Sequence, residues 1–283
     1  MSTLHPHFTT PPIALTIAGS DCSAGAGIQA DLKAFHRAGI HGLSAVTCVV
    51  SEAPGIVEAI HPIPPEIVAS QVSLLLDHYS IRAVKTGMLF SVAHIRAILP
   101  ALLSCHLPIV VDPVMIATSG DPLVEPDAIA SYRDELCPIS TLVTPNLNEA
   151  AALLETDPPK TFTDLRDLAR ELSRKFSTSV LVKGGHFIGL SEAVDLLATA
   201  DGELTEYRSP LIEGVNTHGT GCTLSAAITA ALANGMSLKE TIQHGKNTIT
   251  RAIAHSLRWP TQKNARIPEE MQALNLFGNS IDY

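Results

Sequence analysis

The feature that most constrains this chain is a repeated alternation of short apolar runs with longer amphipathic segments. The run IALTIAG (13–19) predicts a strand buried on both faces, and the segment GIQADLKAFHRAG (27–39) after it predicts a helix. In that segment Ile28, Leu32 and Phe35 share one helical face. Buried strands separated by helices are typical of a mainly parallel sheet covered on both sides.

The alternation continues through most of the chain. Strand patterns lie at 43–50, 83–89, 108–115, 140–146 and 178–186, and helical patterns at 65–79, 91–104, 147–154, 162–176, 222–233 and 237–257. Segments 192–199 and 204–210, joined by ADGE, predict a hairpin at one sheet edge. The order predicts a three-layer α/β/α sandwich with a mainly parallel central sheet. We expect a disordered tail over 1–12, one domain over 13–259 and an extension over 260–283.

Composition and charge narrow the range of partners. The net charge of −9 argues against a nucleic-acid groove, although backbone N–H groups can still bind small anions. The five cysteines form no C-x-x-C pair, so neither a disulfide framework nor a zinc site is indicated. The start of the chain lacks a signal-peptide pattern, and no apolar run approaches the roughly 18 residues of a membrane span. We expect a soluble, cytoplasmic protein without nucleic-acid or membrane partners.

Glycines and polar residues follow several of the predicted strands. They are Gly19-Ser20-Asp21, Lys85-Thr86-Gly87-Met88, Asp112-Pro113, Pro145-Asn146 and Lys183-Gly184-Gly185-His186. Ligands of open parallel sheets bind beyond the carboxyl ends of the strands. The sequence therefore predicts a binding site at this edge of the sheet.

The stretch NTHGTGC (216–222) carries the sharpest local signal. Gly219 and Gly221 allow positive φ and close backbone approach, and the first N–H groups of the following helix lack intrahelical partners. This pattern predicts an anion hole, and the alternative is an ordinary turn before a core helix. At a helix N-terminus the pKa of Cys222 is expected to fall, which would let the thiolate accept a proton from a substrate hydroxyl. The alternative for Cys222 is a small residue that packs well.

Two further motifs suggest phosphate chemistry. In TPNLNE (144–149), Asn146 and Glu149 stand three apart and can hold a magnesium ion through its waters, although an acid is also favourable in a first helical turn. Lys183 can reach a nucleotide phosphate, or it is simply solvated. The segment GAGIQA (25–30) matches a dinucleotide-binding pattern, but SDCSA separates it from the strand, where that motif needs a tight turn. There is no G-x-x-x-x-G-K-[ST] phosphate loop.

The motifs as a set resemble a known family. The matching stretches are ALTIAGSD, GAGIQADLKAF, KTGML, DPVM, SGDPL, TPNLNEAAALL, VLVKGGH and NTHGTGCTLSAAI, over about residues 14 to 257. In this order they resemble the hydroxymethylpyrimidine and phosphomethylpyrimidine kinases of the ribokinase-like superfamily. Many sugar kinases of that superfamily have aspartate at the position of Cys222.

The resemblance implies a ribokinase-like domain over 13–259 that uses ATP and Mg²⁺. It would phosphorylate 4-amino-5-hydroxymethyl-2-methylpyrimidine, then the monophosphate, to the diphosphate used in thiamine synthesis. Such enzymes are usually homodimers. In the implied site, Gly219, Thr220 and Gly221 form the anion hole and Cys222 is the base. ATP is bound by Lys183, Asn146, Gly185 and Thr217, and the metal by Glu149 and Asp112. The pyrimidine is bound by Gly19, Asp21, Ala26, Met88 and Val114.

Two positions depart from the family pattern. Glu52 stands where the family usually has a glutamine that binds the aminopyrimidine, and a carboxylate only accepts hydrogen bonds whereas an amide also donates. Thr118 stands where a lysine is usual in the flap. The alternative functions are a pyridoxal or pyridoxine kinase, a nicotinamide-dependent oxidoreductase built on GAGIQA, and a ligand-binding regulator without catalysis.

Overall fold

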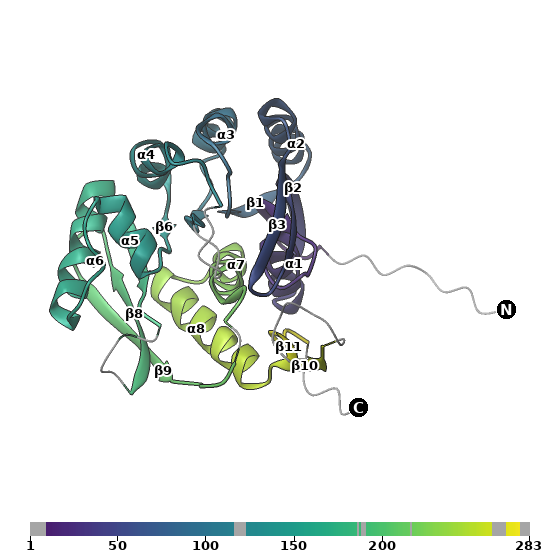
Figure 1. The fold of residues 1–283 in the computed structure, drawn as a ribbon. Helices are drawn as coiled ribbons and strands as arrows, with labels where there is room; N and C mark the ends of the chain where they lie inside the picture. Colours follow the sequence, from purple (N-terminus) through teal and green to yellow (C-terminus); the bar gives the residue numbers. More distant parts are fainter. Residues whose placement is uncertain are drawn as a thin grey trace.

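The computed structural model describes residues 10–115, 123–185, 187, 191–215, 217–261 and 270–277. Within these residues nine strands form one central sheet in the order β3-β2-β1-β4-β5-β6-β7-β8-β9. Helices cover both of its faces, so the predicted three-layer sandwich is confirmed (Figure 1). No helix of the described part is long and apolar enough to cross a membrane.

The middle of the sheet is parallel and its two borders are antiparallel. The parallel strands are β1 (Ile13–Asp21), β2 (His41–Ala53), β4 (Ile81–Thr86), β5 (Ile109–Val111), β6 (Leu142–Val143) and β7 (Ser179–Lys183). The antiparallel strands are β3 (Ile56–Pro62) at one border and β8 (Glu192–Ala198) and β9 (Leu204–Pro210) at the other. The predicted hairpin of β8 and β9 is therefore confirmed. The carboxyl ends of all parallel strands meet at one edge.

Two groups of helices bury the two faces. One face is covered by α1 (Gly27–Arg37), α7 (Thr220–Ala233) and α8 (Leu238–Ala254), the other by α2 (Pro65–His78), α3 (Val92–Cys105), α4 (Ala128–Ser131), α5 (Leu147–Leu154) and α6 (Phe162–Phe176). A π turn (Tyr132–Leu136) and a 3-10 turn (Cys137–Ile139) follow α4. Side chains alternate between the two layers: on β4, Ala83 packs toward α1 and α7, and Val84 packs into the opposite core. This explains the nearly continuous apolar runs.

The structure corrects several predicted boundaries. β2 runs to Ala53 rather than residue 50 and pairs with β3, which the sequence analysis did not predict because much of Ile56–Pro62 is only partly buried. The last helix ends at Ala254, and β10 (Leu257–Pro260) pairs with β11 (Glu270–Ala273) where little periodicity was found. The division at residues 13 and 259 stays a prediction, and residues 1–9 lie outside the described part.

Candidate active site

A cavity of about 520 Å³ opens at the carboxyl edge of the parallel strands. It brings together Glu52 and all the residues that the resemblance implies for the site. These are Gly19, Asp21, Ala26, Glu52, Met88, Asp112, Val114, Asn146, Glu149, Lys183, Gly185, Thr217, Gly219, Thr220, Gly221 and Cys222. The expectation about Thr118 falls outside the described residues.

The turn before α7 is built around Gly219. Its φ is 77°, and a Cβ there would collide with the carbonyl oxygen of Gly25, so both conformation and space require glycine. The Thr220 hydroxyl closes the turn by donating to the Thr217 carbonyl at 2.8 Å. α7 begins at Thr220, two residues before the predicted start. The Thr220 N–H donates to the Thr217 carbonyl at 3.2 Å, and the next two N–H groups, of Gly221 and Cys222, precede the bond from the Thr223 N–H to the Gly219 carbonyl. Gly221 and Cys222 both line the cavity.

Gly221 has a different reason to be glycine. Gly221 does not use the positive φ that glycine allows, because it lies inside the first turn of α7 with an ordinary φ. A Cβ at this position would lie 3.0 Å from Nζ of Lys183 and 3.9 Å from Oδ2 of Asp112. The missing side chain therefore keeps open the space in front of the lysine.

The expected fall in the pKa of Cys222 is contradicted by the structure. Burial raises the pKa of this thiol to about 11, and the carboxylates of Asp112 and Asp31 act in the same direction. The Lys85 ammonium and a hydrogen bond from the Gly27 backbone N–H act in the opposite direction. Although Cys222 is only half-buried by exposed area, the loss of water around its sulfur outweighs the lowering of its pKa by Lys85 and the Gly27 N–H. At neutral pH Cys222 is therefore a thiol.

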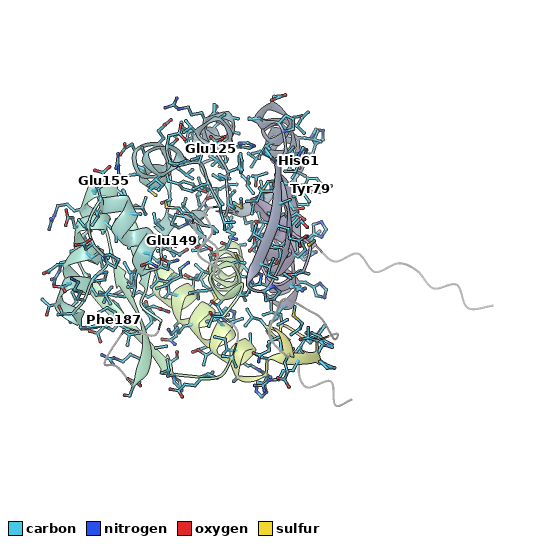
Figure 2. The ribbon with its side chains drawn as sticks, viewed as in Figure 1. His61, Tyr79, Glu125, Glu149, Glu155 and Phe187 are labelled. Carbon is cyan, nitrogen blue, oxygen red and sulfur yellow. The ribbon has the colours of Figure 1, made fainter. Side chains whose placement is uncertain are left out.

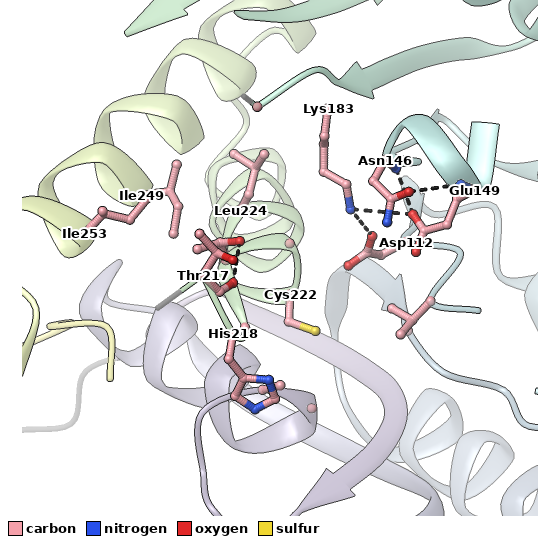
Figure 3. A pocket seen from close by; sticks show the side chains of 18 of the residues that line it. Asp112, Asn146, Glu149, Lys183, Thr217, His218, Cys222, Leu224, Ile249 and Ile253 are labelled. Atoms are coloured by element: carbon pink, nitrogen blue, oxygen red, sulfur yellow. Dashed lines mark hydrogen bonds and ion pairs between the residues drawn. The ribbon is translucent and has the colours of Figure 1, made fainter. Parts of the chain in front are cut away.

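Lys183 links two carboxylates beside this turn. Its Nζ lies 2.8 Å from Oδ1 of Asp112 and 3.9 Å from Oε2 of Glu149 (Figure 3). Burial lowers the pKa of Lys183, but the two carboxylates outweigh it and raise the pKa above its ordinary value. Asp112 also accepts hydrogen bonds from the hydroxyls of Ser225, at 2.9 Å, and Thr144, at 3.2 Å. The solvated alternative for Lys183 is therefore wrong.

Glu149 is held by the start of α5. Its carboxylate accepts from the Asn146 backbone N–H at 2.7 Å while the Asn146 side chain accepts from the Glu149 N–H at 2.9 Å, a reciprocal capping box. Burial raises the pKa of Glu149 to about 7, with a further contribution from Asp112. Figure 2 shows Glu149 toward the middle of the molecule and Glu155, at the end of the same helix, near its periphery.

The oxygen donors of Asp112 and Glu149 suit a magnesium ion. Mg²⁺ binds one or two carboxylates and keeps several waters. The raised pKa of Glu149 has the repulsion from Asp112 as one of its causes, and a cation between the two carboxylates would relieve that repulsion. The side-chain oxygen of Asn146 is already engaged in the helix cap, so its contribution is to position Glu149.

Asp21, Glu52 and His218 gather at the other end of the cavity. One ligand atom from each lies within 4.8 Å of the others. Asp21 accepts hydrogen bonds from the backbone N–H groups of Ser23, at 2.7 Å, and Ala26, at 2.7 Å, and from His218 Nε2 at 3.1 Å. These hydrogen bonds fix the Asp21 carboxylate beside Glu52 and His218.

The charges of this cluster are strongly interdependent. Burial would raise the pKa of Asp21, but its hydrogen bonds from His218, Ser23 and Ala26 lower it to about 2. Burial would lower the pKa of His218, but Asp21 and Glu52 raise it above the ordinary value. Burial and the neighbouring Asp21 charge raise the pKa of Glu52 to about 7. Glu52 therefore changes its charge near neutral pH.

The glycines of GAGIQA pack loops in this fold. A Cβ on Gly25 would lie 2.6 Å from the ring of His218, and Gly27 has a φ of 58° and lies against Gly19 and Asp21. They thus support the end of the cavity at which Asp21 and His218 lie. Gly19 has a similar role, since a Cβ there would lie 2.8 Å from Sγ of Cys48.

The sequence analysis missed the apolar wall that α7 and α8 supply. Leu224, Ile249 and Ile253 line this part of the cavity, away from His218 in Figure 3. The four-residue spacing of Ile249 and Ile253 is a signal that could have found it. Lys246 and Asp195 also line the cavity and form a buried ion pair of 2.7 Å. No local sequence pattern predicts this pair, because its residues lie far apart in the chain.

Solved structures place this architecture in a known class. The chain is similar to a pyridoxal kinase from Bacillus subtilis solved with ADP, with a TM-score of 0.82 and 34% identity over 94% of this chain and 98% of that chain. It is also similar to a phosphomethylpyrimidine kinase from Clostridium difficile, with a TM-score of 0.75 and 35% identity over 86% and 99% of the two chains. The protein is a kinase of the ribokinase-like fold.

Sequence comparison gives the family. The family model described as phosphomethylpyrimidine kinase matches residues 21–265, and the chain belongs to this family. A hydroxymethylpyrimidine/phosphomethylpyrimidine kinase from Rhizobium meliloti is 43% identical over 86% of this chain and 90% of its own length. A probable thiamine biosynthetic bifunctional enzyme from rice is 40% identical over 87% of this chain. The chain spans only 45% of that longer relative.

Proposed function

We propose that this protein transfers the γ-phosphoryl group of ATP to the hydroxymethyl group of 4-amino-5-hydroxymethyl-2-methylpyrimidine, and then phosphorylates the monophosphate to the diphosphate used in thiamine synthesis. The observation that carries this proposal is the cavity face where the α7 N-terminus, Cys222 and the Lys183–Asp112 pair meet. The names of its relatives support the substrate, and the ADP complex of the Bacillus subtilis enzyme supports ATP as donor.

At the phosphate end, the chain supplies positive charge and backbone donors. The first N–H groups of α7 and the Lys183 ammonium bind the transferred phosphoryl group, where negative charge is concentrated. Phosphate oxygens compete with Asp112 for Lys183, and Gly221 leaves room for this exchange. Asp112 and Glu149 would hold Mg²⁺, which supplies charge neutralisation for the phosphates. The leucine and isoleucine wall is suited to the adenine ring.

At the substrate end, Cys222 and Glu52 have separate tasks. Cys222 is a thiol at rest, so it first releases its proton to solvent, and its thiolate then takes the proton of the substrate hydroxyl as that oxygen attacks phosphorus. Ionised Glu52 accepts from the exocyclic amine and from a protonated ring nitrogen, a charge-assisted pair with two hydrogen bonds. Asp21 and His218 form the polar floor beside Glu52, and Gly19, Ala26, Met88 and Val114 pack against the ring.

A pyridoxal kinase is the second candidate. One observation favours it: the Bacillus subtilis pyridoxal kinase has the higher TM-score of the two solved relatives above. A pyridine ring offers a single nitrogen, so it can make one of the two hydrogen bonds that Glu52 offers an aminopyrimidine. Competition between the two substrates for limiting enzyme separates the candidates, with preferential phosphorylation of the pyrimidine expected and preferential phosphorylation of pyridoxal contradicting the proposal.

The homodimer and the cytoplasmic location expected from the sequence belong to the same proposal. Light scattering of the purified protein during size-exclusion chromatography measures its mass directly. About twice the chain mass of 30.0 kDa is expected, and the mass of a single chain would exclude the dimer.

A further inference from the structure

A buried ion pair lies beneath the cavity and has no role in the reaction described above. Nζ of Lys85 lies 2.7 Å from both carboxylate oxygens of Asp31, and both side chains have no exposed surface. The hydroxyl of Thr16 donates to the same carboxylate at 2.6 Å. Lys85 comes from β4 at the centre of the sheet, and Asp31 comes from α1 above it.

Such a pair is costly as a purely structural device. Taking two charges out of water carries a desolvation penalty that their attraction often fails to offset, so apolar side chains of similar volume are frequently as stable. Ala83, two residues before Lys85 on the same strand, shows that this layer otherwise uses small apolar residues. Buried charges next to a cavity are more typical of functional sites.

The geometry points from this pair to Cys222. Lys85 and Cys222 line the same cavity, at the place where β4, α1 and the first turn of α7 meet. Asp31 lies on α1, one turn after Gly27, the first residue of this helix, which lines the cavity too. The charge of Lys85 and the backbone of Gly27 both act on the Cys222 sulfur, and both favour its ionised form.

We propose that the Lys85–Asp31 pair is a positioning element for the Cys222 thiolate. Asp31 fixes the Lys85 ammonium beside the sulfur, where its positive charge stabilises the negative charge that the sulfur acquires when it loses its proton. This inference rests on the proposed role of Cys222 as base. Cys222 releases its proton to solvent before the reaction. The thiolate then takes the proton of the substrate hydroxyl while the new oxygen–phosphorus bond forms and the bond to ADP breaks, which regenerates the thiol.

The charges around the sulfur support this direction. After burial, the Lys85 ammonium is the largest influence on the pKa of Cys222, and it lowers that pKa. Asp112 and Asp31 oppose it, and Lys183 also interacts with the sulfur. Because Lys183 would be drawn to the nucleotide phosphates, Lys85 is the cation that remains beside the thiolate throughout the reaction.

The test measures the thiol directly and needs no substrate. Alkylation of Cys222 by iodoacetamide is followed by peptide mass spectrometry from pH 7.5 to 9.5, because only the thiolate reacts. The double variant Lys85→Met/Asp31→Asn removes both charges without leaving one unpaired. Alkylation of Cys222 is expected to slow about tenfold at each pH, which corresponds to about one pH unit in the titration. Unchanged rates in the folded double variant overturn the proposal.

A matched control and a variant of opposite sign make the test specific. Lys246→Met/Asp195→Asn removes another buried pair that lines the same cavity, and Cys222 alkylation is expected to stay at the wild-type rate. Asp31→Asn alone removes a carboxylate that opposes ionisation of the sulfur and keeps the Lys85 charge, so alkylation is expected to accelerate. A slower or unchanged rate in Asp31→Asn also contradicts the proposal, whether or not the double variant folds. Failure to phosphorylate the pyrimidine would overturn the proposed function without affecting these thiol measurements.

Discussion

Lys183 and Asp112 form a 2.8 Å ion pair directly in front of Gly221, where a Cβ would lie 3.0 Å from the lysine nitrogen. The pair therefore occupies the space beside the α7 N-terminus in which the phosphoryl group is proposed to bind. Asp112 neutralises the charge of Lys183 and holds its ammonium in place until phosphate oxygens compete for the lysine.

Replacing Gly221 with alanine is expected to slow the chemical step by about 100-fold or more, because the new methyl group displaces Lys183 from the transferred phosphoryl group. Single-turnover phosphorylation by rapid quench measures this step. Gly235→Ala is the control for lost stability, since it adds a methyl group beyond the other end of α7 at a φ of 83°, which strains the backbone without reaching the cavity. A Gly221→Ala protein that reacts at the wild-type rate would show that phosphate does not bind at this position.

Replacing Cys222 with alanine is expected to preserve ATP binding and reduce turnover by about 100- to 10,000-fold, the usual contribution of a general base. Calorimetry of nucleotide binding and steady-state kinetics separate the two effects. Cys105→Ala, on α3 and outside the cavity, is expected to retain wild-type turnover. Turnover of Cys222→Ala within a few fold of wild type would remove the base from the mechanism.

The pH dependence of substrate binding is expected to depend on Glu52. Its pKa is raised to about 7, so free Glu52 loses its proton above neutral pH. The proposed complex needs one proton shared between Glu52 and the ring, so affinity is expected to fall about tenfold per unit as pH rises above 7. In Glu52→Gln this dependence should disappear while binding persists. Calorimetric titrations at several pH values decide, and identical profiles for the two proteins would exclude the protonated pair.

Ionised Glu149 is expected to lower the free energy of unfolding at alkaline pH. Its pKa is raised from 4.5 to about 7 in the folded protein, so the folded state binds more protons than the unfolded state between these values. Its contribution to the free energy of unfolding therefore falls as pH rises from 4.5 to about 7 and stays low above that.

The matched variant for this prediction is Glu149→Gln, which keeps an oxygen for the helix cap. We expect it to raise the melting temperature at pH 8, measured without Mg²⁺, and to have a smaller effect at pH 4.5. Phosphorylation should be lost at both pH values. A Glu149→Gln protein that melts below wild type at pH 8 would show that the carboxylate charge stabilises the fold.

Sequence patterns predicted the bounds of helices well where a capping box and a helical apolar period occur together. α5 and α6 have the predicted bounds of 147–154 and 162–176, because each begins with a capping box and carries a helical apolar period. β3 was missed because an edge strand with partly exposed side chains has no clear period. The β10–β11 pair joins segments separated along the chain, which no local pattern reports.

The sequence predicted where the site residues gather but not their electrostatics, and their roles stay predictions. The residues that the resemblance implies for the site line one cavity, since the carboxyl ends of parallel strands must meet. The pKa of Cys222 was predicted in the wrong direction, because burial of its sulfur depends on how α1 and β4 pack around it. The pairing of Lys85 with Asp31, 54 positions apart, is likewise a property of the folded sheet.

The most direct test of the account is mass spectrometry of the products formed from 4-amino-5-hydroxymethyl-2-methylpyrimidine and Mg-ATP. The account predicts that the monophosphate appears first and is converted to the diphosphate, with one ADP released at each step. Absence of any phosphorylated pyrimidine, with pyridoxal phosphate formed from pyridoxal under the same conditions, would contradict it.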